Sequence, residues 1–382
     1  MALDSETLAQ LTGTMQRFVE ERLIPAEPRV EAENAIPPEI VEEMRHLGLF
    51  GMSIPQEHGG LGLTMAEEVE IAFVLGRAAP AFRSLIGTNN GIGSQGIVID
   101  GTPEQKAHWL PRLASGEMIS SFALTEPDAG SDAASISLSA RRDGDAYVLN
   151  GAKRFITNAP VAGLFTVMAR TEPDVKGAKG ISAFLVEADT PGLTVGKPDR
   201  KMGQRGALTA DVFFEDCRVP ASAIIGGVPG RGFATAMKVL DRGRLHISAI
   251  CAGAATRLLD DALAFALERK QFDQPIAEFQ LIQAMLADSR TELYAGQSMV
   301  RDAARRRDGG ESVSLEASCC KLFCSEMVGR VADRAVQIHG GAGYMADYAV
   351  ERFYRDVRLF RIYEGTSQIQ QLVIARNMIA GA

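Results

Sequence analysis

The sequence predicts an α+β chain in three consecutive parts: a helical part, a β part and a second helical part. Apolar residues recur every three to four positions between residues 4 and 113 and again from residue 232 onward, which is the period of a helix. Between residues 119 and 223 they alternate, which is the period of a strand. No proline follows Pro275, which favours long helices packed as a bundle. We therefore expect domains at 1–118, 119–226 and 227–382.

Length and charge narrow the class of protein. A chain of 382 residues with 46% hydrophobic content can build more than one sizeable core. A net charge of −8 would repel a nucleic-acid backbone, so we expect no nucleic-acid partner. Apolar runs such as 164–169 fall far short of the ~18 residues of a membrane span, and the N-terminus lacks a signal-peptide pattern. The expectation is a soluble, cytoplasmic protein without a membrane span.

The cysteines show no metal or disulfide pattern. They form no C-x-x-C pair and have no histidine at zinc-ligand spacing. We expect them to pack as small apolar residues in a reducing compartment, with no metal bound. The cysteines are Cys217, Cys251, Cys319, Cys320 and Cys324.

Two helix starts are marked in the first part. Thr64–Glu67 and Thr102–Gln105 have the residue pattern of a capping box. Gly91–Gly96 reads G-x-G-x-x-G, and Glu117 follows where a ribose-binding acid would stand. Helical patterns flank this stretch instead of a strand, so we reject a dinucleotide site and expect its glycines to form a thin helix surface.

Turn residues divide the β part. Asp143-Gly144 predicts a turn after the alternating residues 136–140. Asn150-Gly151 predicts a β-hairpin, because this dipeptide adopts the turn that joins two antiparallel strands. Further strands are expected at 165–168, 183–186 and 211–214.

The final part contains the candidate catalytic residue. Periodic apolar positions predict helices through 281–304 and 315–338, and Arg305–Arg307 reads as the solvated end of the first. Near the C-terminus Glu364 stands between Tyr363 and Gly365, with no basic neighbour in sequence and a helix starting at Thr366. Such a carboxylate is a candidate general base, although an acidic residue before a capped helix is common.

Six segments together resemble the acyl-CoA dehydrogenase family, in order and over essentially the whole chain. They are FALTEPDAGSD at 122–132, YVLNGAKRFITN at 147–158, ERKQF at 268–272, AEFQ at 277–280, QIHGGAGY at 337–344 and IYEGTSQIQ at 362–370. The resemblance implies a helical N-terminal domain, a middle antiparallel β-barrel-like domain and a C-terminal four-helix bundle. It also implies FAD between the last two domains and a homotetramer built as a dimer of dimers.

The resemblance assigns the FAD contacts by motif. Within one subunit they would be Phe122, Leu124, Thr125, Ser131, Phe155, Ile156, Thr157, Thr366 and Gln368. Thr157 would lie near flavin N5, and Phe155 stands where many relatives have tryptophan. The FAD of the neighbouring subunit would be reached by Arg269, Phe272, Gln280, Gln337, Gly340 and Gly341. A forked guanidinium and unobstructed glycine N–H groups suit a pyrophosphate.

The substrate contacts follow in the same way. Acyl-CoA would be held by Ser131, Asp241, Arg244, Tyr363 and Gly365, with Arg244 contacting coenzyme A. Some branches of the family place the base at the position of Gly243, so a glycine there and Glu364 in the loop imply that Glu364 is the base. It would take the α proton while flavin N5 accepts the β hydride, and an electron-transfer flavoprotein would reoxidise the flavin.

Alternatives remain at this stage. An acyl-CoA oxidase would pass electrons to oxygen, flavin monooxygenase relatives lack the base, and a helical scaffold without chemistry would be colourless. The acyl group is open as well. If a helix at Phe82–Gly96 lines the acyl cavity, Gly87, Thr88, Asn89, Asn90 and Gly91 leave room or polarity there. We therefore expect a pocket that admits branched, cyclic or functionalised acyl groups.

Overall fold

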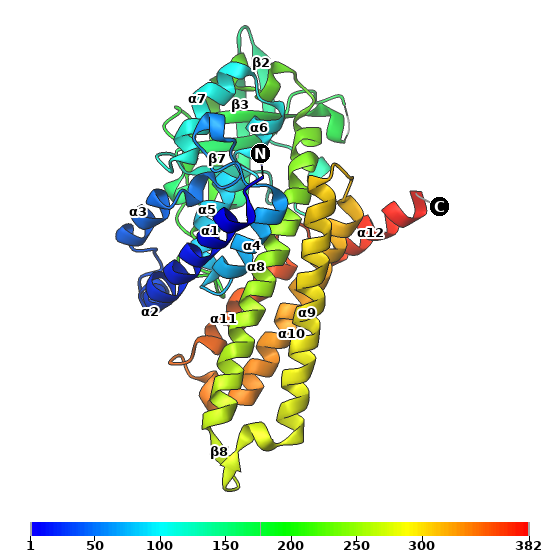
Figure 1. Cartoon of the computed structure of the whole chain (residues 1–382). Coiled ribbons are helices and arrows are strands. Elements are labelled where there is room, and N and C mark those ends of the chain that lie inside the picture. The colour runs from blue at the N-terminus through cyan, green and yellow to red at the C-terminus, as the bar shows by residue number, and fades with distance from the viewer. Residues whose placement is uncertain (1, 176, 381–382) are drawn as a thin grey trace.

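The computed structural model describes residues 2–175 and 177–380, and its parts follow the predicted order (Figure 1). The first part contains the helices α1 (Ser5–Phe18), α2 (Ile24–Glu33), α3 (Pro38–His46), α4 (Met65–Leu75), α5 (Pro80–Asn90), α6 (Gln95–Asp100) and α7 (Pro103–Ala114). The second contains the strands β1 (Ser120–Ala123), β2 (Ser139–Asp143), β3 (Ala146–Thr157), β4 (Leu164–Arg170), β5 (Ile181–Glu187), β6 (Leu193–Val195) and β7 (Thr209–Pro220). The third contains α8 (Gly232–Glu268), β8 (Lys270–Gln271), β9 (Gln274–Pro275), α9 (Gln280–Asp308), α10 (Ser314–His339), α11 (Ala349–Val357) and α12 (Ser367–Ala380).

Helix α8 connects the parts. It is 37 residues long and packs against α4 on one side and against α9 and α10 on another (Figure 1). Gly76, at the end of α4, allows close approach, because a Cβ there would lie 2.5 Å from the backbone oxygen of Ile250. The middle of α8 is consequently buried on all sides, and this buried stretch carries the residues next to the candidate base.

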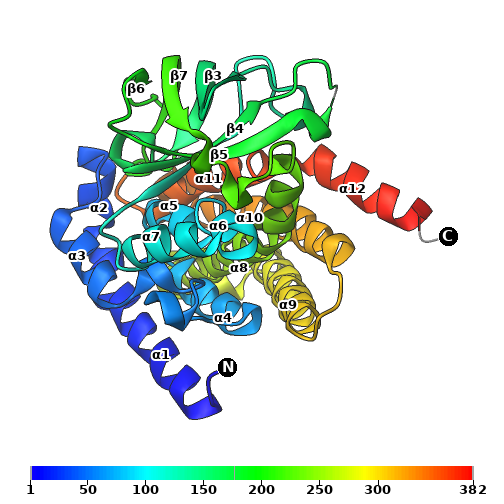
Figure 2. The ribbon, with the colours of Figure 1, turned by 90° about the horizontal axis from the view of Figure 1, so that it is seen from above.

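The β part forms one seven-stranded sheet beside the helices (Figure 2). Its strands follow the order β1-β4-β2-β3-β7-β6, and β5 pairs with β4. The pairs are antiparallel except that β4 runs parallel to β1 and, at one bridge, to β2. This exception allows the chain entering from α7 to lie next to β4 in the sheet, where β1 also contacts α5.

The predicted turn at Gly144 is confirmed, but the predicted hairpin at Asn150-Gly151 is wrong. Both residues lie inside β3, where the register with β7 shifts between Leu149 and Gly151. Asn150 Nδ2 donates to Asp216 Oδ1 at 3.1 Å, and the Asp216 N–H donates to Asn150 Oδ1 at 2.8 Å. Pairing with Asp216, 66 positions away along the chain, thus overrides the local turn preference, and Gly151 lies at a bulge instead.

The expected helix at Phe82–Gly96 is broken. Helix α5 ends at Asn90, a turn follows, and α6 begins at Gln95. The glycines at 91 and 93 lie in this turn, so they do not form a helix surface as expected. A Cβ on Gly93 would collide with Ser120 of β1, so the turn packs directly on the sheet. The rejection of a dinucleotide site stands, because a helix and not a strand precedes this stretch.

Local helix signals are confirmed. Both capping boxes, at Thr64 and Thr102, have both of their hydrogen bonds. Cys319 is partly exposed and the other four cysteines are buried, all as free thiols. Within residues 2–175 and 177–380 no cluster of side chains could hold a metal ion, and no helix there combines the length and hydropathy of a membrane span.

Candidate active site

Glu364 lies in the loop that joins the 3-10 helix Arg358–Arg361 to α12. It adopts the left-handed conformation with φ of 54°, and Gly365 follows with φ of 88°. Thr366 caps α12 as predicted, because the Ile369 N–H donates to its Oγ1 at 3.2 Å. A non-glycine residue at positive φ needs support from its surroundings, and this loop receives it from two sides.

Two side chains hold the backbone of the loop. Gln370 Nε2 donates to the carbonyl oxygens of Glu364 and Gly365 at 3.1 and 3.2 Å. Lys321 Nζ, from α10, donates to the oxygen of Gly365 at 2.6 Å. Lys321 is fully buried, and burial lowers its pKa from the ordinary value. The loop is therefore tied to the core of the helical bundle.

Gly243 of α8 faces the carboxylate of Glu364. A Cβ on Gly243 would lie 2.7 Å from Glu364 Oε2. Positions 243 and 364 thus border the same small space, and the carboxylate occupies it because the glycine leaves it empty.

Arg83 of α5 forms an ion pair with Glu364. Its Nη2 donates to Glu364 Oε1 at 3.2 Å, and the two side chains are only 10% and 13% exposed. Within the described parts of the chain, Arg83 Nε and Glu364 Oε2 are buried without a hydrogen-bond partner. The carboxylate therefore has one paired oxygen, on the side of Arg83, and one free oxygen, on the side of α8.

Sequence reasoning missed both Arg83 and Lys321. Arg83 is 281 positions from Glu364 along the chain, and no local pattern joins them. Each is a single charge inside an apolar run, AFRSLI for Arg83 and CKLFC for Lys321. Such a charge on a buried helix face was the available signal, because a cation is rarely buried without a partner.

The polar side chains of Thr88, Asn89 and Asn90 in α5 are used in hydrogen bonds within the chain, so the expected free polarity at these three positions is wrong. Asn89 Nδ2 donates to the backbone oxygens of Leu113 and Met118 at 2.9 and 2.8 Å. Asn90 Nδ2 donates to the backbone oxygens of Leu49 and Ile86 at 2.5 and 3.1 Å. The hydroxyl of Thr88 accepts a hydrogen bond from Asn158 Nδ2 at 2.8 Å. These side chains fix the connections around α5.

In the stretch 241–244, which is expected to contact coenzyme A, some side-chain donors and acceptors are already used in hydrogen bonds within the chain. Arg244 is buried, and its Nη1 donates to Asp241 Oδ1 at 2.9 Å and to Ser318 Oγ at 3.3 Å. Arg244 Nε is buried without a partner among the residues described. The Nε–H of Arg244 is thus a buried donor available to a ligand, while Asp241 orients the side chain.

A buried charge cluster supports the same turn of α8. Glu68 of α4 pairs with Arg242, and its Oε1 lies 2.7 Å from His246 Nδ1. Burial opposes ionisation of Glu68, but the Arg242 guanidinium and the hydrogen bond with His246 outweigh it and lower the pKa of Glu68 to about 2. Arg242 is therefore directed toward α4.

Tyr363 packs beside the base. Its ring lies 5.9 Å from that of Phe360, and its hydroxyl is buried without a partner in the described residues. Burial raises the pKa of Tyr363, so it stays neutral. An unpaired buried hydroxyl is available to a ligand.

The β part presents an aromatic surface at the end of β3. Phe155 is 60% exposed and has a φ of 58°, which turns it out of the strand. Ile156 is buried in the core of the sheet, so only its backbone could contact a cofactor. Ser121 Oγ donates to the backbone oxygen of Thr157 at 2.5 Å, and Ser131 is exposed in the loop after β1.

A buried ion pair fixes the segment after β1 against β3. Lys153 Nζ donates to the backbone oxygen of Leu124 at 3.0 Å and to Glu126 Oε1 at 2.8 Å. Burial lowers the pKa of Lys153 to about 8, although Glu126 opposes this shift. Phe122, Leu124 and Thr125 are partly exposed beside this pair. Three expected FAD contacts therefore lie on a rigid support.

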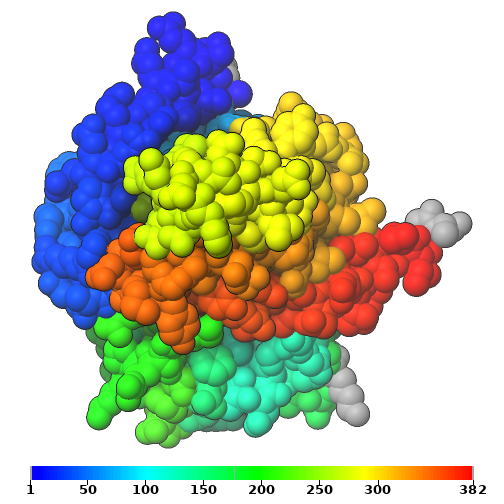
Figure 3. Space-filling model, turned by 90° about the horizontal axis from the view of Figure 1, so that it is seen from below, coloured from blue at the N-terminus to red at the C-terminus, as the bar shows by residue number. Residues whose placement is uncertain are grey.

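The residues expected to reach a neighbour's FAD gather at the tip of the bundle, far from the sheet (Figure 1). Figure 3 shows this tip from below, with the segment around β8 beside the segment after α10. Phe272 is 89% exposed, and a Cβ on Gly340 or Gly341 would meet nothing within 4 Å. Arg269, Gln280 and Gln337 are exposed as well. Gln337 is 16 positions along α10 from Lys321, or about 24 Å.

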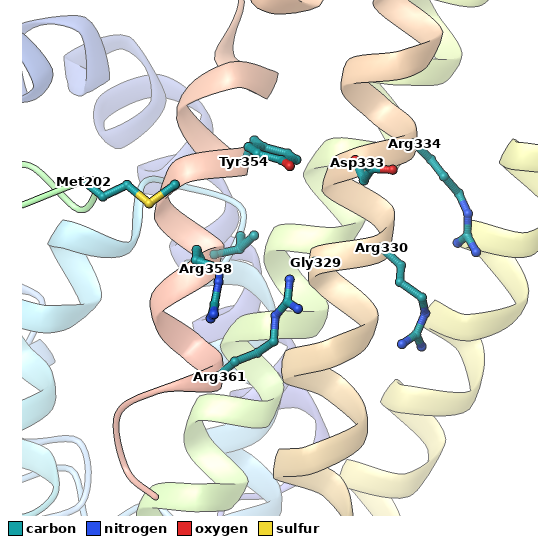
Figure 4. Close-up of a pocket in the computed structure, with 9 residues that line it drawn as sticks. Met202, Gly329, Arg330, Asp333, Arg334, Tyr354, Arg358 and Arg361 are labelled. Atoms are coloured by element: carbon teal, nitrogen blue, oxygen red, sulfur yellow. The ribbon is translucent and has the colours of Figure 1, made fainter. Parts of the chain in front are cut away.

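Two cavities lie on the side of α10 that faces α11 and the loop. One of about 550 Å³ is lined by Arg330, Arg334, Arg358 and Arg361, together with Asp333 and Tyr354 (Figure 4). The other, of about 180 Å³, shares Arg358 and Arg361 and adds Thr366 and Gln368. Neither cavity includes Glu364.

The residues present fit FAD. The aromatic ring of Phe155, 60% exposed, offers an apolar surface for a flavin ring. Guanidinium groups beside the hydroxyl of Thr366 and the amide of Gln368 offer donors for a diphosphate.

Comparisons with known proteins cover the whole chain. Models of the N-terminal, middle and C-terminal domains of acyl-CoA dehydrogenase match residues 5–117, 121–217 and 230–379. The chain is 41% identical over 374 residues to the human mitochondrial short-chain specific acyl-CoA dehydrogenase, covering 98% of this chain and 90% of the relative. It is 42% identical over 350 residues to the CarC subunit of the caffeyl-CoA reductase-Etf complex of Acetobacterium woodii, covering 92% of each. A solved structure of PigA with FAD and proline superposes with a TM-score of 0.95 at 28% identity over 100% of both chains.

Proposed function

The chain belongs to the acyl-CoA dehydrogenase family of flavin-dependent oxidoreductases, and we propose that it oxidises an acyl-CoA thioester to the trans-2-enoyl-CoA with Glu364 as the base. One observation carries this assignment: among the residues that the structure describes, Glu364 Oε2 is buried without a hydrogen-bond partner against Gly243, while the rest of the loop is held in place. A carboxylate with one free, desolvated oxygen is suited to take a proton from a weak carbon acid.

The residues of the loop have separate roles in proton removal. Glu364 Oε2 accepts the α proton, and the Glu364 N–H donates to the thioester carbonyl, where negative charge develops. Lys321 and Gln370 keep both groups in place through the backbone oxygens of Glu364 and Gly365. Tyr363 and Gly365 border the acyl group, and Arg244 contacts coenzyme A. Fixed donors lower the barrier because they need no reorganisation during the reaction.

FAD, when bound, supplies the acceptor for the β hydride. Phe155 and the backbone of Ile156 would cover its ring, with Thr157 beside it, while Phe122, Leu124, Thr125 and Ser131 would line the approach. Thr366 and Gln368 would add contacts to the FAD, which links the loop of the base to the cofactor. The structural neighbour solved with FAD supports this assignment.

The direction of the reaction depends on the electron partner. We assign an electron-transfer flavoprotein as that partner, which the relative from a reductase-Etf complex supports. The same relative favours a second candidate function, reduction of an enoyl-CoA, which uses the same residues with Glu364 donating the proton. Transfer of electrons to oxygen remains the third alternative.

The site is shared between subunits in this proposal. Arg269, Gln280 and the glycines at 340 and 341 would complete the FAD site of a neighbour, so at least a dimer is needed and a homotetramer is expected. Helix α12 projects from the body of the chain (Figure 2), and Leu372, Met378 and Ile379 are exposed on it. Exposed apolar side chains on a projecting helix favour contact with another subunit.

The decisive experiment is optical. The purified protein should show a flavin spectrum, and a panel of acyl-CoA thioesters should bleach it without oxygen. Bleaching by no saturated acyl-CoA, with reoxidation of the reduced protein by enoyl-CoA, would instead establish the reductase. A colourless protein that cannot be loaded with FAD would contradict both.

A further inference from the structure

We propose that Arg83 binds a carboxylate carried by the acyl group, so that the substrate is the CoA monothioester of a short dicarboxylic acid. The inference rests on the proposed function, because it places the acyl chain between Glu364 and α5. It goes further by naming the chemical class of the acyl group.

The first support is the unused capacity of Arg83. A guanidinium has five N–H donors, and within the described residues Arg83 uses one of them, in the 3.2 Å bond to Glu364 Oε1. Its Nε is buried and unpartnered, and the side chain is 10% exposed. Beyond its pair with Glu364, Arg83 is thus a buried cation with an unsatisfied donor among the described residues, and an anion carried by the ligand would satisfy it.

The second support is the space left for this side chain. A Cβ on Gly87, one turn along α5, would lie 3.0 Å from Arg83 Cζ. The glycine therefore allows the guanidinium to lie flat against α5 and face Glu364. The polar side chains of Thr88, Asn89 and Asn90 are bound elsewhere, so they do not compete for a ligand at this point.

The third support is charge balance during the reaction. When Glu364 accepts the α proton it becomes neutral, and Arg83 would then be a buried cation without its counter-ion. A substrate carboxylate restores the pair at that moment and leaves Glu364 free to face the α-carbon. The carboxylate takes no part in the bond changes: the α C–H and β C–H bonds break as in any substrate of this class.

The position of Arg83 also limits the length of the acyl group. Its Nη2 is 3.2 Å from the base, and the α-carbon must approach that base to about 3–3.5 Å. Only a few carbon atoms can separate the thioester α-carbon from a carboxylate bound at Arg83. A plain alkyl chain would place apolar carbon against a guanidinium that loses its partner when Glu364 is protonated, which is unfavourable.

The test compares diacid and monoacid thioesters with the FAD-loaded enzyme. Anaerobic flavin reduction is measured with succinyl-, glutaryl- and adipyl-CoA, with butyryl-, valeryl- and hexanoyl-CoA, and with the methyl esters of the diacid thioesters. We expect kcat/KM for the best diacid to exceed that for its matched monoacid and its methyl ester by about 10–150-fold, the range for a charged hydrogen bond. Equal or better reduction by the monoacids would overturn the carboxylate assignment while leaving the proposed function intact. Failure of every thioester would overturn the function itself.

A substitution at Arg83 tests whether this residue causes the preference for diacid thioesters. Arg83→Met should lower the ratio of diacid to monoacid kcat/KM by about 10–150-fold. Arg77→Met removes a cation that pairs with Asp260 at 2.9 Å near the surface, and it should leave this ratio unchanged. An unchanged ratio in Arg83→Met would exclude Arg83. Should that variant fail to fold, binding of adipyl- and hexanoyl-CoA to Glu364→Gln, which retains Arg83, decides: equal dissociation constants would contradict the proposal.

Discussion

A Cβ on Gly243 would lie 2.7 Å from Glu364 Oε2, so a helix residue and a loop residue 121 positions apart border the same space. Each of the two positions determines what the other can be. A side chain at 243 would displace the carboxylate at 364, and a base placed at 243 would need a small residue at 364.

Gly243→Ala should slow flavin reduction. A methyl group at 2.7 Å from the carboxylate must push Glu364 away, and misplacement by about 1 Å costs roughly 10²-fold in rate. Alanine favours a helix over glycine, so the thermal midpoint should not fall for lack of helix propensity. Gly13→Ala is the matched control, since its new methyl would meet only Arg17 at 3.9 Å. The measurement is the anaerobic bleaching rate under acyl-CoA.

Glu364→Gln should bind acyl-CoA but fail to remove its α proton. Glutamine keeps the shape and the backbone N–H, while the proton acceptor is lost. Acyl-CoA should still perturb the flavin spectrum, and bleaching should slow by at least ~10²–10⁴-fold. Single-turnover bleaching is the appropriate readout, because turnover can be limited by product release. An unchanged bleaching rate would place the base elsewhere.

Lys153→Met should destabilise the β part. It leaves the carboxylate of Glu126 buried without its cation, which costs about 3–5 kcal/mol. Denaturant unfolding measures the loss. Adding Glu126→Gln to this variant removes the unpaired carboxylate charge and should recover part of the stability. If the single variant were as stable as the parent, the pair at Lys153 would not support the wall of the site.

Stability should depend on pH through Glu68. Its pKa is lowered in the folded protein to about 2, below the ordinary 4.5, so its contribution is complete above pH 4.5 and is lost as the pH falls toward 2. The shift corresponds to roughly 3 kcal/mol. In Glu68→Gln this acid-labile part should disappear from the curve of unfolding free energy against pH. Glu70→Gln, which breaks a partly exposed pair with Arg301, should retain it.

Arg269→Ala should weaken FAD binding if the tip serves a neighbouring subunit. Loss of a charged hydrogen bond costs about 1.5–3 kcal/mol, or roughly 10–150-fold in affinity. Arg290→Ala, exposed on α9, is the control. Equilibrium dialysis at several protein concentrations also tests the shared site, since FAD should dissociate together with the subunits. A monomeric variant that holds FAD as tightly as the parent would contradict it.

The sequence predicts local features better than distant contacts. Caps at Thr64, Thr102 and Thr366 need only neighbours within one helical turn, and all three are present. Asn150-Gly151 fails because pairing with β7 decides its conformation. Motif resemblance identifies the family and proposes Glu364, but not Arg83 or Lys321, whose partners are fixed only when α5, α10 and the loop pack together. The only local indication of these two residues in the sequence is a single charged residue within an apolar helical run.

Asn150 in β3 also affects how the protein ages. Asparagine before glycine loses ammonia readily during storage, because the glycine nitrogen can attack the side-chain carbonyl. Both polar atoms of the Asn150 side chain are held by Asp216 across the sheet, at 3.1 and 2.8 Å, so this attack requires β3 to leave β7. The rate of ammonia loss at this one position, followed by peptide mapping of stored protein, would therefore measure how often the sheet opens.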